Sequence, residues 1–179
     1  MLDPRAVHDL VRSLADPSDG ELTKSRDLVL YILEHTPTPF SRDQFTPGHI
    51  TCTGLVLSPA SDAVLLVHHR RLDRWLLPGG HVEPADPTIA DAARREVLEE
   101  TGVLLDPDPS PRLIGIDVHG IPPGKGEPYH LHHDLLFAFR AQSRDTQLSH
   151  ESRAIAWSCP DEFERYDLPR NIRRAYTRL

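Results

Sequence analysis

The stretch from Gly79 to Val103, GGHVEPADPTIADAARREVLEETGV, is the most informative part of this chain. Two glycines open it, and three carboxylates, Glu96, Glu99 and Glu100, fall within five residues near its end. Oxygen ligands at this density, close to a glycine turn, are typical of a site that holds a hard cation beside a phosphate. The stretch therefore predicts a phosphate-handling metal site.

A helix is expected to follow the glycine turn. Asp86 and Pro87 are suited to the N-cap and the first helical position. Gly102 is suited to the left-handed residue that ends a helix. We therefore interpret Asp86 as a helix cap and expect the helix to end at Gly102.

The glutamates of this helix lie on an unexpected side. At about 100° per residue, Glu96 and Glu100 share the side that carries the apolar residues, and Glu99 lies at its edge. A solvated helix end would place its glutamates on the opposite side. Carboxylates beside an apolar stripe cost free energy through desolvation and mutual repulsion unless they share a cation, so a metal site is the favoured interpretation. The apolar stripe consists of Ile89, Ala92, Ala93 and Val97.

These residues resemble the Nudix box, G-x5-E-x7-R-E-U-x-E-E-x-G-U, in which U is a bulky aliphatic residue. Gly80 matches the first glycine, and Arg95 to Val103 match the second half at every specified position. The sequence departs from the pattern at two places. Asp86 replaces the first glutamate, and eight residues instead of seven separate it from Arg95.

The resemblance implies an α/β fold, namely a Nudix-type α/β/α sandwich with a mixed β-sheet. It also implies a Mg²⁺-dependent hydrolase, in which Mn²⁺ can substitute, that cleaves the diphosphate linkage of a nucleoside diphosphate linked to another moiety. Such a substrate is a nucleoside triphosphate, ADP-ribose or a nucleotide sugar. The alternative is a Nudix-fold module that binds a nucleotide or a partner without turnover, and prenyl diphosphate isomerase chemistry is disfavoured by so complete a box.

Roles within the site follow from the same resemblance. The metal ligands are expected to be Glu96, Glu99, Glu100 and the backbone carbonyl of Gly79, with Glu96 the first candidate for the base that takes a proton from water. Arg95 is expected to hold a box carboxylate or a loop carbonyl. A further acid is expected before a strand that bears a tryptophan.

Glu151 is the candidate for this further acid, because it precedes Trp157. The alternative is an ordinary loop glutamate. Arg70 ends an apolar run and is a second candidate for substrate contact, through phosphate; it fits a solvated turn equally well.

The histidine-rich segment from His130 to Asp134 is another candidate. Strand alternation places His130, His132 and Asp134 on one face and His133 on the other. We favour the interpretation that these histidines only form hydrogen bonds with neighbouring residues. Contact with substrate ranks second. A second metal site ranks third; it would hold a softer ion such as Zn²⁺, which imidazole suits.

Apolar patterning predicts the remaining elements. Residues 1–46 are expected to form an N-terminal extension of two helices, and residues 47–179 the Nudix hydrolase domain. The extension is expected to pack on the domain, with a lid or a homodimer contact as the sharper alternative. Strands are expected at 50–57, 63–69, 113–119, 130–141 and 154–158, and a terminal helix at 171–179.

Composition sets limits on partners. Lys and Arg total 20 and Asp and Glu total 27, which gives a formal net charge of −7. This balance disfavours long nucleic acid, but it leaves a small nucleotide substrate open because a bound cation supplies positive charge. The two cysteines do not indicate a disulfide framework, and the sequence shows neither a signal peptide nor a membrane-length apolar run. A cytoplasmic location without membrane contact is therefore expected.

Overall fold

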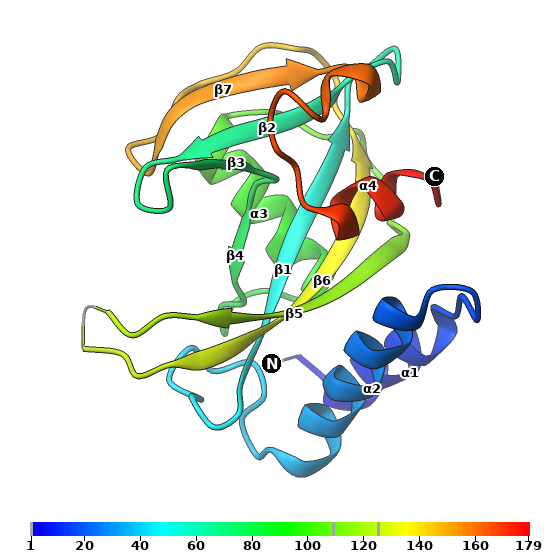
Figure 1. Cartoon of the computed structure of the whole chain (residues 1–179), viewed down its shortest axis with the longest axis vertical. Coiled ribbons are helices and arrows are strands. Elements are labelled where there is room, and N and C mark those ends of the chain that lie inside the picture. The colour runs from blue at the N-terminus through cyan, green and yellow to red at the C-terminus, as the bar shows by residue number, and fades with distance from the viewer. Residues whose placement is uncertain (1, 109, 125) are drawn as a thin grey trace.

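The computed structural model describes residues 2–108, 110–124 and 126–179. Within them the chain forms one mixed sheet of seven strands with four α-helices around it (Figure 1). None of these helices has both the length and the apolar character that a membrane crossing requires. The strands are β1 (Gly48–Leu57), β2 (Val64–His69), β3 (Arg74–Leu76), β4 (Gly79–His81), β5 (Leu113–Ile121), β6 (His130–Arg140) and β7 (Ser152–Ser158). The helices are α1 (Pro4–Ser13), α2 (Gly20–His35), α3 (Ile89–Thr101) and α4 (Arg170–Tyr176).

The long strand β1 organises the sheet. It pairs in parallel with β6 along its whole length, and β6 pairs antiparallel with β5. On its other edge, β1 pairs with β4 near its start and with β2 at its end. The strands β3 and β7 both pair with β2. One parallel pair among antiparallel ones makes the sheet mixed, as the sequence predicts.

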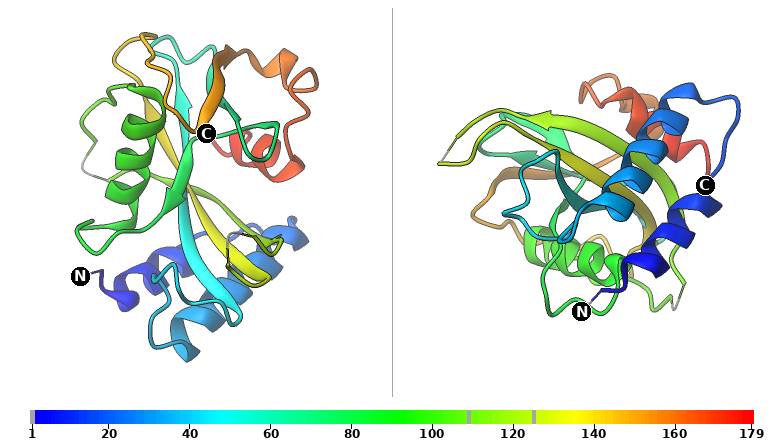
Figure 2. Two further views of the ribbon diagram at one scale, coloured as in Figure 1. Left: turned by 90° about the vertical axis from the view of Figure 1, so that its left-hand side faces the viewer. Right: turned by 90° about the horizontal axis from the view of Figure 1, so that it is seen from below.

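Side-chain alternation along β1 separates two apolar clusters. Ile50 and Cys52 belong to a cluster that also contains the apolar stripe of α3. Leu55 belongs to a second cluster, which packs against Ile172 of α4. The side view shows α3 and α4 on opposite faces of the sheet (Figure 2). The predicted α/β/α sandwich is therefore confirmed.

The strand β4 differs from the expectation for Gly79 and Gly80. These residues were expected to form only a turn, but they pair with Thr53 and Cys52 of β1 as a short antiparallel strand. A three-residue strand with two glycines carries too little β propensity to be recognised from sequence. Its pairing fixes the glycines against the centre of the sheet, beside the N-terminal half of β1.

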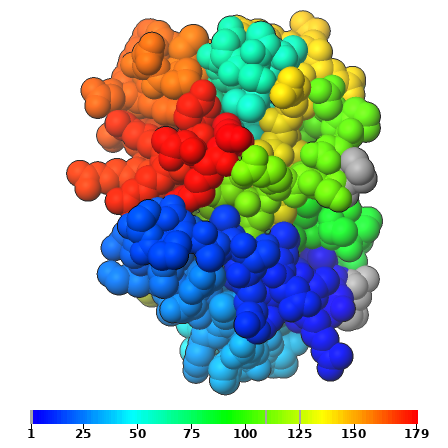
Figure 3. Space-filling model, turned by 90° about the vertical axis from the view of Figure 1, so that its right-hand side faces the viewer, coloured from blue at the N-terminus to red at the C-terminus, as the bar shows by residue number. Residues whose placement is uncertain are grey.

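The two predicted N-terminal helices are present, and they pack on the rest of the chain as expected. Val11 of α1 and Ile32 of α2 are fully buried in the same cluster as the stripe of α3. In the space-filling view the N-terminal segment, in blue, lies directly against the C-terminal segment, in red (Figure 3). The division of the chain at residue 46 and the role of these helices as a lid or dimer contact stay predictions.

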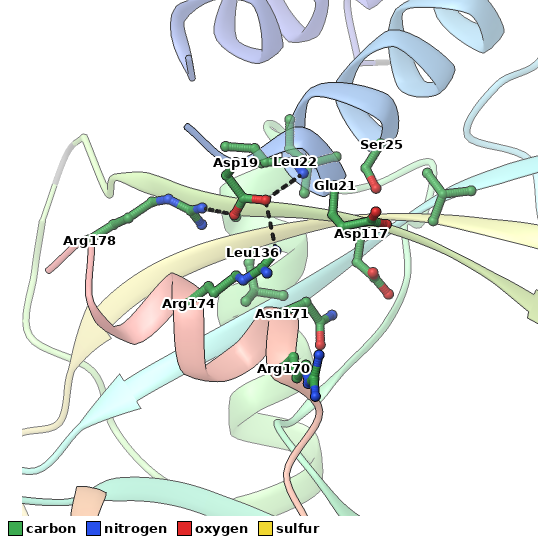
Figure 4. A pocket seen from close by; sticks show the side chains of 13 residues that line it. Asp19, Glu21, Leu22, Ser25, Asp117, Leu136, Arg170, Asn171, Arg174 and Arg178 are labelled. Atoms are coloured by element: carbon green, nitrogen blue, oxygen red, sulfur yellow. Dashed lines mark hydrogen bonds and ion pairs between the residues drawn. The ribbon is translucent and has the colours of Figure 1, made fainter. Parts of the chain in front are cut away.

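A buried carboxylate joins the two ends of the chain. Asp19 caps α2 by accepting a hydrogen bond from the Leu22 amide, and it pairs with Arg174 and Arg178 at 2.9 and 2.5 Å. These contacts lie in a polar cavity of about 500 Å³ between α2, β5 and α4 (Figure 4). None of the box glutamates lines this cavity, which is therefore separate from the candidate active site.

Candidate active site

The helix α3 starts later than the sequence predicts. Thr88 is its N-cap and accepts a hydrogen bond from the Asp91 amide at 3.1 Å. The interpretation of Asp86 as the cap is therefore wrong. The predicted end is correct, because Gly102 adopts the left-handed conformation with φ of 67°. Thr88 competes successfully for the cap because its hydroxyl reaches the third amide along the chain.

The buried face of α3 carries two of the three glutamates. All four residues of the predicted apolar stripe are buried. Glu100 is only 7% exposed, and the side chain of Glu96 is 14% exposed. The Glu99 side chain is 57% exposed, which fits its place at the edge of the stripe. The three carboxylates thus run from the interior of the molecule to its surface along one side of the helix.

Arg95 connects this helix to the preceding loop. Its guanidinium donates to both oxygens of Asp86, to Glu96 at 2.9 Å, to Glu99 at 3.1 Å and to the carbonyl oxygen of His81 at 2.8 Å. These contacts agree with the expectation that Arg95 holds box carboxylates and a loop carbonyl. The sequence did not predict the contact between Arg95 and Asp86. The position of Asp86, where the Nudix box has its first acidic residue, could have indicated that this side chain has a role in the site.

The two glycines of β4 allow two close approaches: Gly80 to Glu96 of α3, and Gly79 to the neighbouring strand β1. A Cβ atom on Gly80 would lie 2.7 Å from the carboxylate carbon of Glu96. A Cβ atom on Gly79 would lie 2.5 Å from the carbonyl oxygen of Cys52. Both distances are shorter than van der Waals contact, so only glycine fits at either position without displacement. Gly80 therefore sets the distance between the backbone of β4 and Glu96, and Gly79 sets the distance between β4 and β1.

The buried glutamates are poorly compensated without a cation. Burial, together with the nearby charges of Glu96 and Glu151, raises the pKa of Glu100 to about 8. Burial also raises the pKa of Glu96, although its hydrogen bond to Arg95 opposes this shift. A divalent cation bound between the two side chains would stabilise their ionised carboxylates. The donor set of three carboxylates and a nearby backbone carbonyl therefore fits a hard cation.

The structure brings Glu151 near this cluster. Its charge acts on the pKa of both Glu96 and Glu100, and its own side chain is 56% exposed, directly before β7. Arg70 packs on the same segment, where its guanidinium donates to the carbonyl oxygens of His150 and Ser152. Arg70 thus holds the segment that contains Glu151. A contact between Arg70 and substrate stays a prediction.

The predicted polar face of β6 is present. Asp134 is buried, and its two oxygens accept hydrogen bonds from Thr51 at 3.0 Å and Thr53 at 2.7 Å on β1. His130 and His132 lie near each other, with ring centroids 5.3 Å apart. Asp134 therefore joins two neighbouring strands, and a contact between these three residues and substrate stays a prediction.

The comparisons with known proteins agree with this geometry. The model of the NUDIX domain matches residues 48–179. The chain belongs to the Nudix family. It is accordingly a hydrolase that acts on pyrophosphate bonds, and Nudix hydrolases generally use a divalent metal.

Individual Nudix relatives align with part of the chain. The nucleoside triphosphatase NudI of Salmonella arizonae is 36% identical over 98 residues, which are 53% of this chain and 68% of that protein. The m7GpppN-mRNA hydrolase NUDT17 of Danio rerio is 50% identical over 101 residues, which are 53% of this chain but only 33% of that protein. The NUDIX domain of Shewanella oneidensis NrtR, crystallised with ADP-ribose, superimposes with a TM-score of 0.54 at 17% identity over 83% of this chain and 96% of that one. At this identity the superposition indicates a shared fold.

Proposed function

We propose that the chain is a Mg²⁺-dependent hydrolase of a nucleoside diphosphate linked to another moiety, with nucleoside triphosphates as the first substrate class to test. The observation that carries the proposal is that Glu100 is buried and Glu96 largely buried on the apolar side of α3, where Glu96 lies against Gly80. The name of the aligned nucleoside triphosphatase supports the choice of triphosphates.

In this proposal Glu96, Glu99, Glu100 and the carbonyl oxygen of Gly79 hold the ion. When bound, Mg²⁺ supplies the positive charge that diphosphate oxygens require and makes water more acidic. Arg95 fixes the carboxylates of Glu96 and Glu99, so that they need little rearrangement when the ion and the diphosphate arrive.

A water molecule attacks one phosphorus of the diphosphate linkage, and the bond between that phosphorus and the bridging oxygen breaks. A carboxylate accepts the proton of the water. We propose Glu96 for this role and Glu151 as its rival, because the more exposed Glu151 lies close enough to influence both buried glutamates. Comparison of the pH profiles of Glu96→Gln and Glu151→Gln separates them, because loss of the base removes the acidic limb of the profile.

The test is a substrate panel with product analysis. Nucleoside and deoxynucleoside triphosphates, ADP-ribose and sugar nucleotides are incubated with the protein and either Mg²⁺ or Mn²⁺, and the products are separated by chromatography. The proposal expects metal-dependent cleavage of at least one compound at its diphosphate linkage. Absence of cleavage across the panel with both ions would contradict it.

A further inference from the structure

Three histidines from neighbouring strands converge on one side of the sheet. His49 lies on β1, His81 on β4 and His132 on β6. In the sheet β1 lies between the other two strands, where its His49 pairs directly with His132 and its Thr51 pairs with His81. One nitrogen from each imidazole lies within 4.8 Å of the others. The arrangement is set by strand register, so it does not depend on loop conformation.

His49 has one ring nitrogen that is available to bind a ligand. Its Nδ1 lies 3.1 Å from the carbonyl oxygen of Gln44, which can only accept, so Nδ1 carries the proton. The neutral ring then has a lone pair on Nε2. This atom is buried and has no hydrogen-bond partner among the described residues, in a residue that is 1% exposed. Metal-binding histidines characteristically donate their second nitrogen to a backbone carbonyl in this way.

The imidazole of His132 is also held in the neutral form. Burial, with smaller contributions from the neighbouring imidazoles, lowers the pKa of His132 to about 2. A metal ligand must be the neutral imidazole, because a protonated ring nitrogen has no lone pair. His49 and His132 therefore each offer a nitrogen lone pair to a metal at neutral pH.

We propose that His49, His81 and His132 bind one transition-metal ion of the Zn²⁺ class, with a fourth position open to water or an anion. Imidazole nitrogens select Zn²⁺, Co²⁺ or Ni²⁺ over Mg²⁺, which prefers oxygen. Tetrahedral coordination with usual Zn–N bonds places the nitrogens about 3.4 Å apart, so small side-chain rotations suffice. Three histidines and an open position form a known type of zinc site.

This histidine site and the carboxylate site are neighbours with different donors. The carbonyl oxygen of His81 accepts from Arg95, whereas its imidazole faces the other histidines. The proposal therefore stands independently of the proposed hydrolase activity. The competing explanation is a purely structural group of packed rings, since His49 also stacks on His130 with centroids 5.1 Å apart.

Calorimetric titration of the metal-free, full-length protein with Zn²⁺ tests the site. Mg²⁺ is kept in large excess, so that the harder ion occupies the box carboxylates. We expect one equivalent of Zn²⁺ to bind. His81→Gln and His132→Gln should each weaken binding by more than about 100-fold, the upper range for losing an outer-sphere partner. The exposed His150→Gln and the box variant Glu100→Gln should bind Zn²⁺ as the wild type does.

A measurement on the unmodified protein covers the case in which a variant fails to fold. Zn²⁺ should shift the imidazole ¹⁵N resonances of His49, His81 and His132 at one equivalent in an NMR titration. The proposal is overturned if the wild type binds no Zn²⁺, if the shifts fall on other histidines, or if binding is unchanged in both histidine variants or lost in Glu100→Gln.

Discussion

Arg95 of α3 and Asp86, which precedes this helix, form a two-point ion pair: Nε lies 3.1 Å from Oδ1, and Nη2 lies 3.0 Å from Oδ2. Asp86 is 6% exposed, and its Oδ2 also accepts from the Glu83 amide at 2.7 Å. Planar paired hydrogen bonds of this kind fix both the position and the orientation of a guanidinium. The acid that breaks the box pattern therefore acts as an anchor for the arginine that holds the glutamates.

Replacement of Asp86 by Ala should destabilise the protein and lower its activity. The change removes two charge-assisted hydrogen bonds from Arg95, which keeps Glu96 and Glu99 as partners, and this costs about 2 kcal/mol in the free energy of unfolding. Burial alone would raise the pKa of Asp86, but the Arg95 and Glu83 hydrogen bonds lower it overall. Its stabilisation is thus present above the pKa of an unfolded aspartate and is lost as the pH falls through the folded value.

Urea denaturation at neutral pH and at pH about 3, below the usual aspartate pKa, measures this effect. The exposed Asp9→Ala serves as the matched control and should leave stability nearly unchanged. An Asp86→Ala protein as stable as the wild type at neutral pH would show that the ion pair contributes nothing.

Replacement of Glu100 by Gln should stabilise the metal-free protein at alkaline pH. Glu100 has a folded pKa of about 8, above the value of about 4.3 in an unfolded chain. Its contribution to stability is therefore present below pH about 4 and is lost as the pH rises toward 8. At pH 8 the variant should exceed the wild type by on the order of 2 kcal/mol, with the difference shrinking on acidification.

Thermal unfolding of both proteins with a chelator between pH 5 and 8 measures this difference. Glu164→Gln, whose side chain is 88% exposed, is the control and should follow the wild type. Addition of Mg²⁺ should raise the wild-type melting temperature and leave Glu100→Gln unchanged. A constant difference across the pH range would contradict the raised pKa.

Replacement of Gly80 by Ala should impair catalysis through displacement of Glu96. The added methyl group would lie 2.7 to 2.8 Å from the Glu96 carboxylate atoms, so the side chain must move. A shift of about 1 Å in a catalytic group costs roughly 100-fold in rate. Gly20→Ala, where a Cβ atom meets nothing within 4 Å, is the matched control for steady-state kinetics. Equal rates for the two variants would argue against close contact in solution.

Replacement of Asp19 by Ala should release the N-terminal helices from the C-terminal segment. The change removes the cap of α2 and leaves Arg174 and Arg178 without their shared carboxylate. We expect a loss of about 3 kcal/mol in the free energy of unfolding and early hydrogen exchange in α1 and α2. Asp27→Ala, an exposed aspartate of α2, provides the comparison. Unchanged exchange in both helices would show that apolar packing alone holds them.

The sequence predicted the main elements because their signals are local. The stripe of α3, the left-handed Gly102 and the apolar runs of the longer strands each depend on neighbours within a few residues. The observed strands agree with the expected ranges to within a few residues, and the terminal helix covers Arg170–Tyr176 instead of 171–179. The burial of Glu96 and Glu100 was predictable for the same reason.

The remaining features depend on contacts between distant segments. The local sequence predicts that Asp86 is a helix cap, because proline follows it. Its actual partner, Arg95, contacts it only once α3 is packed on β4. The histidine group requires the parallel pairing of His49 with His132, which lie 83 positions apart in the chain. Strand pairing at that separation leaves no periodic pattern in the sequence.

The most direct test of the proposed function is the Mg²⁺-dependent rate of diphosphate cleavage in Glu100→Gln, measured beside Glu164→Gln with the best substrate of the panel. We expect kcat/KM of Glu100→Gln to fall by more than about 100-fold while the protein stays folded, because the proposed metal site would lose a buried ligand. Glu164→Gln should match the wild type. A Glu100→Gln enzyme with wild-type kcat/KM would contradict the assignment of the box carboxylates as the metal site.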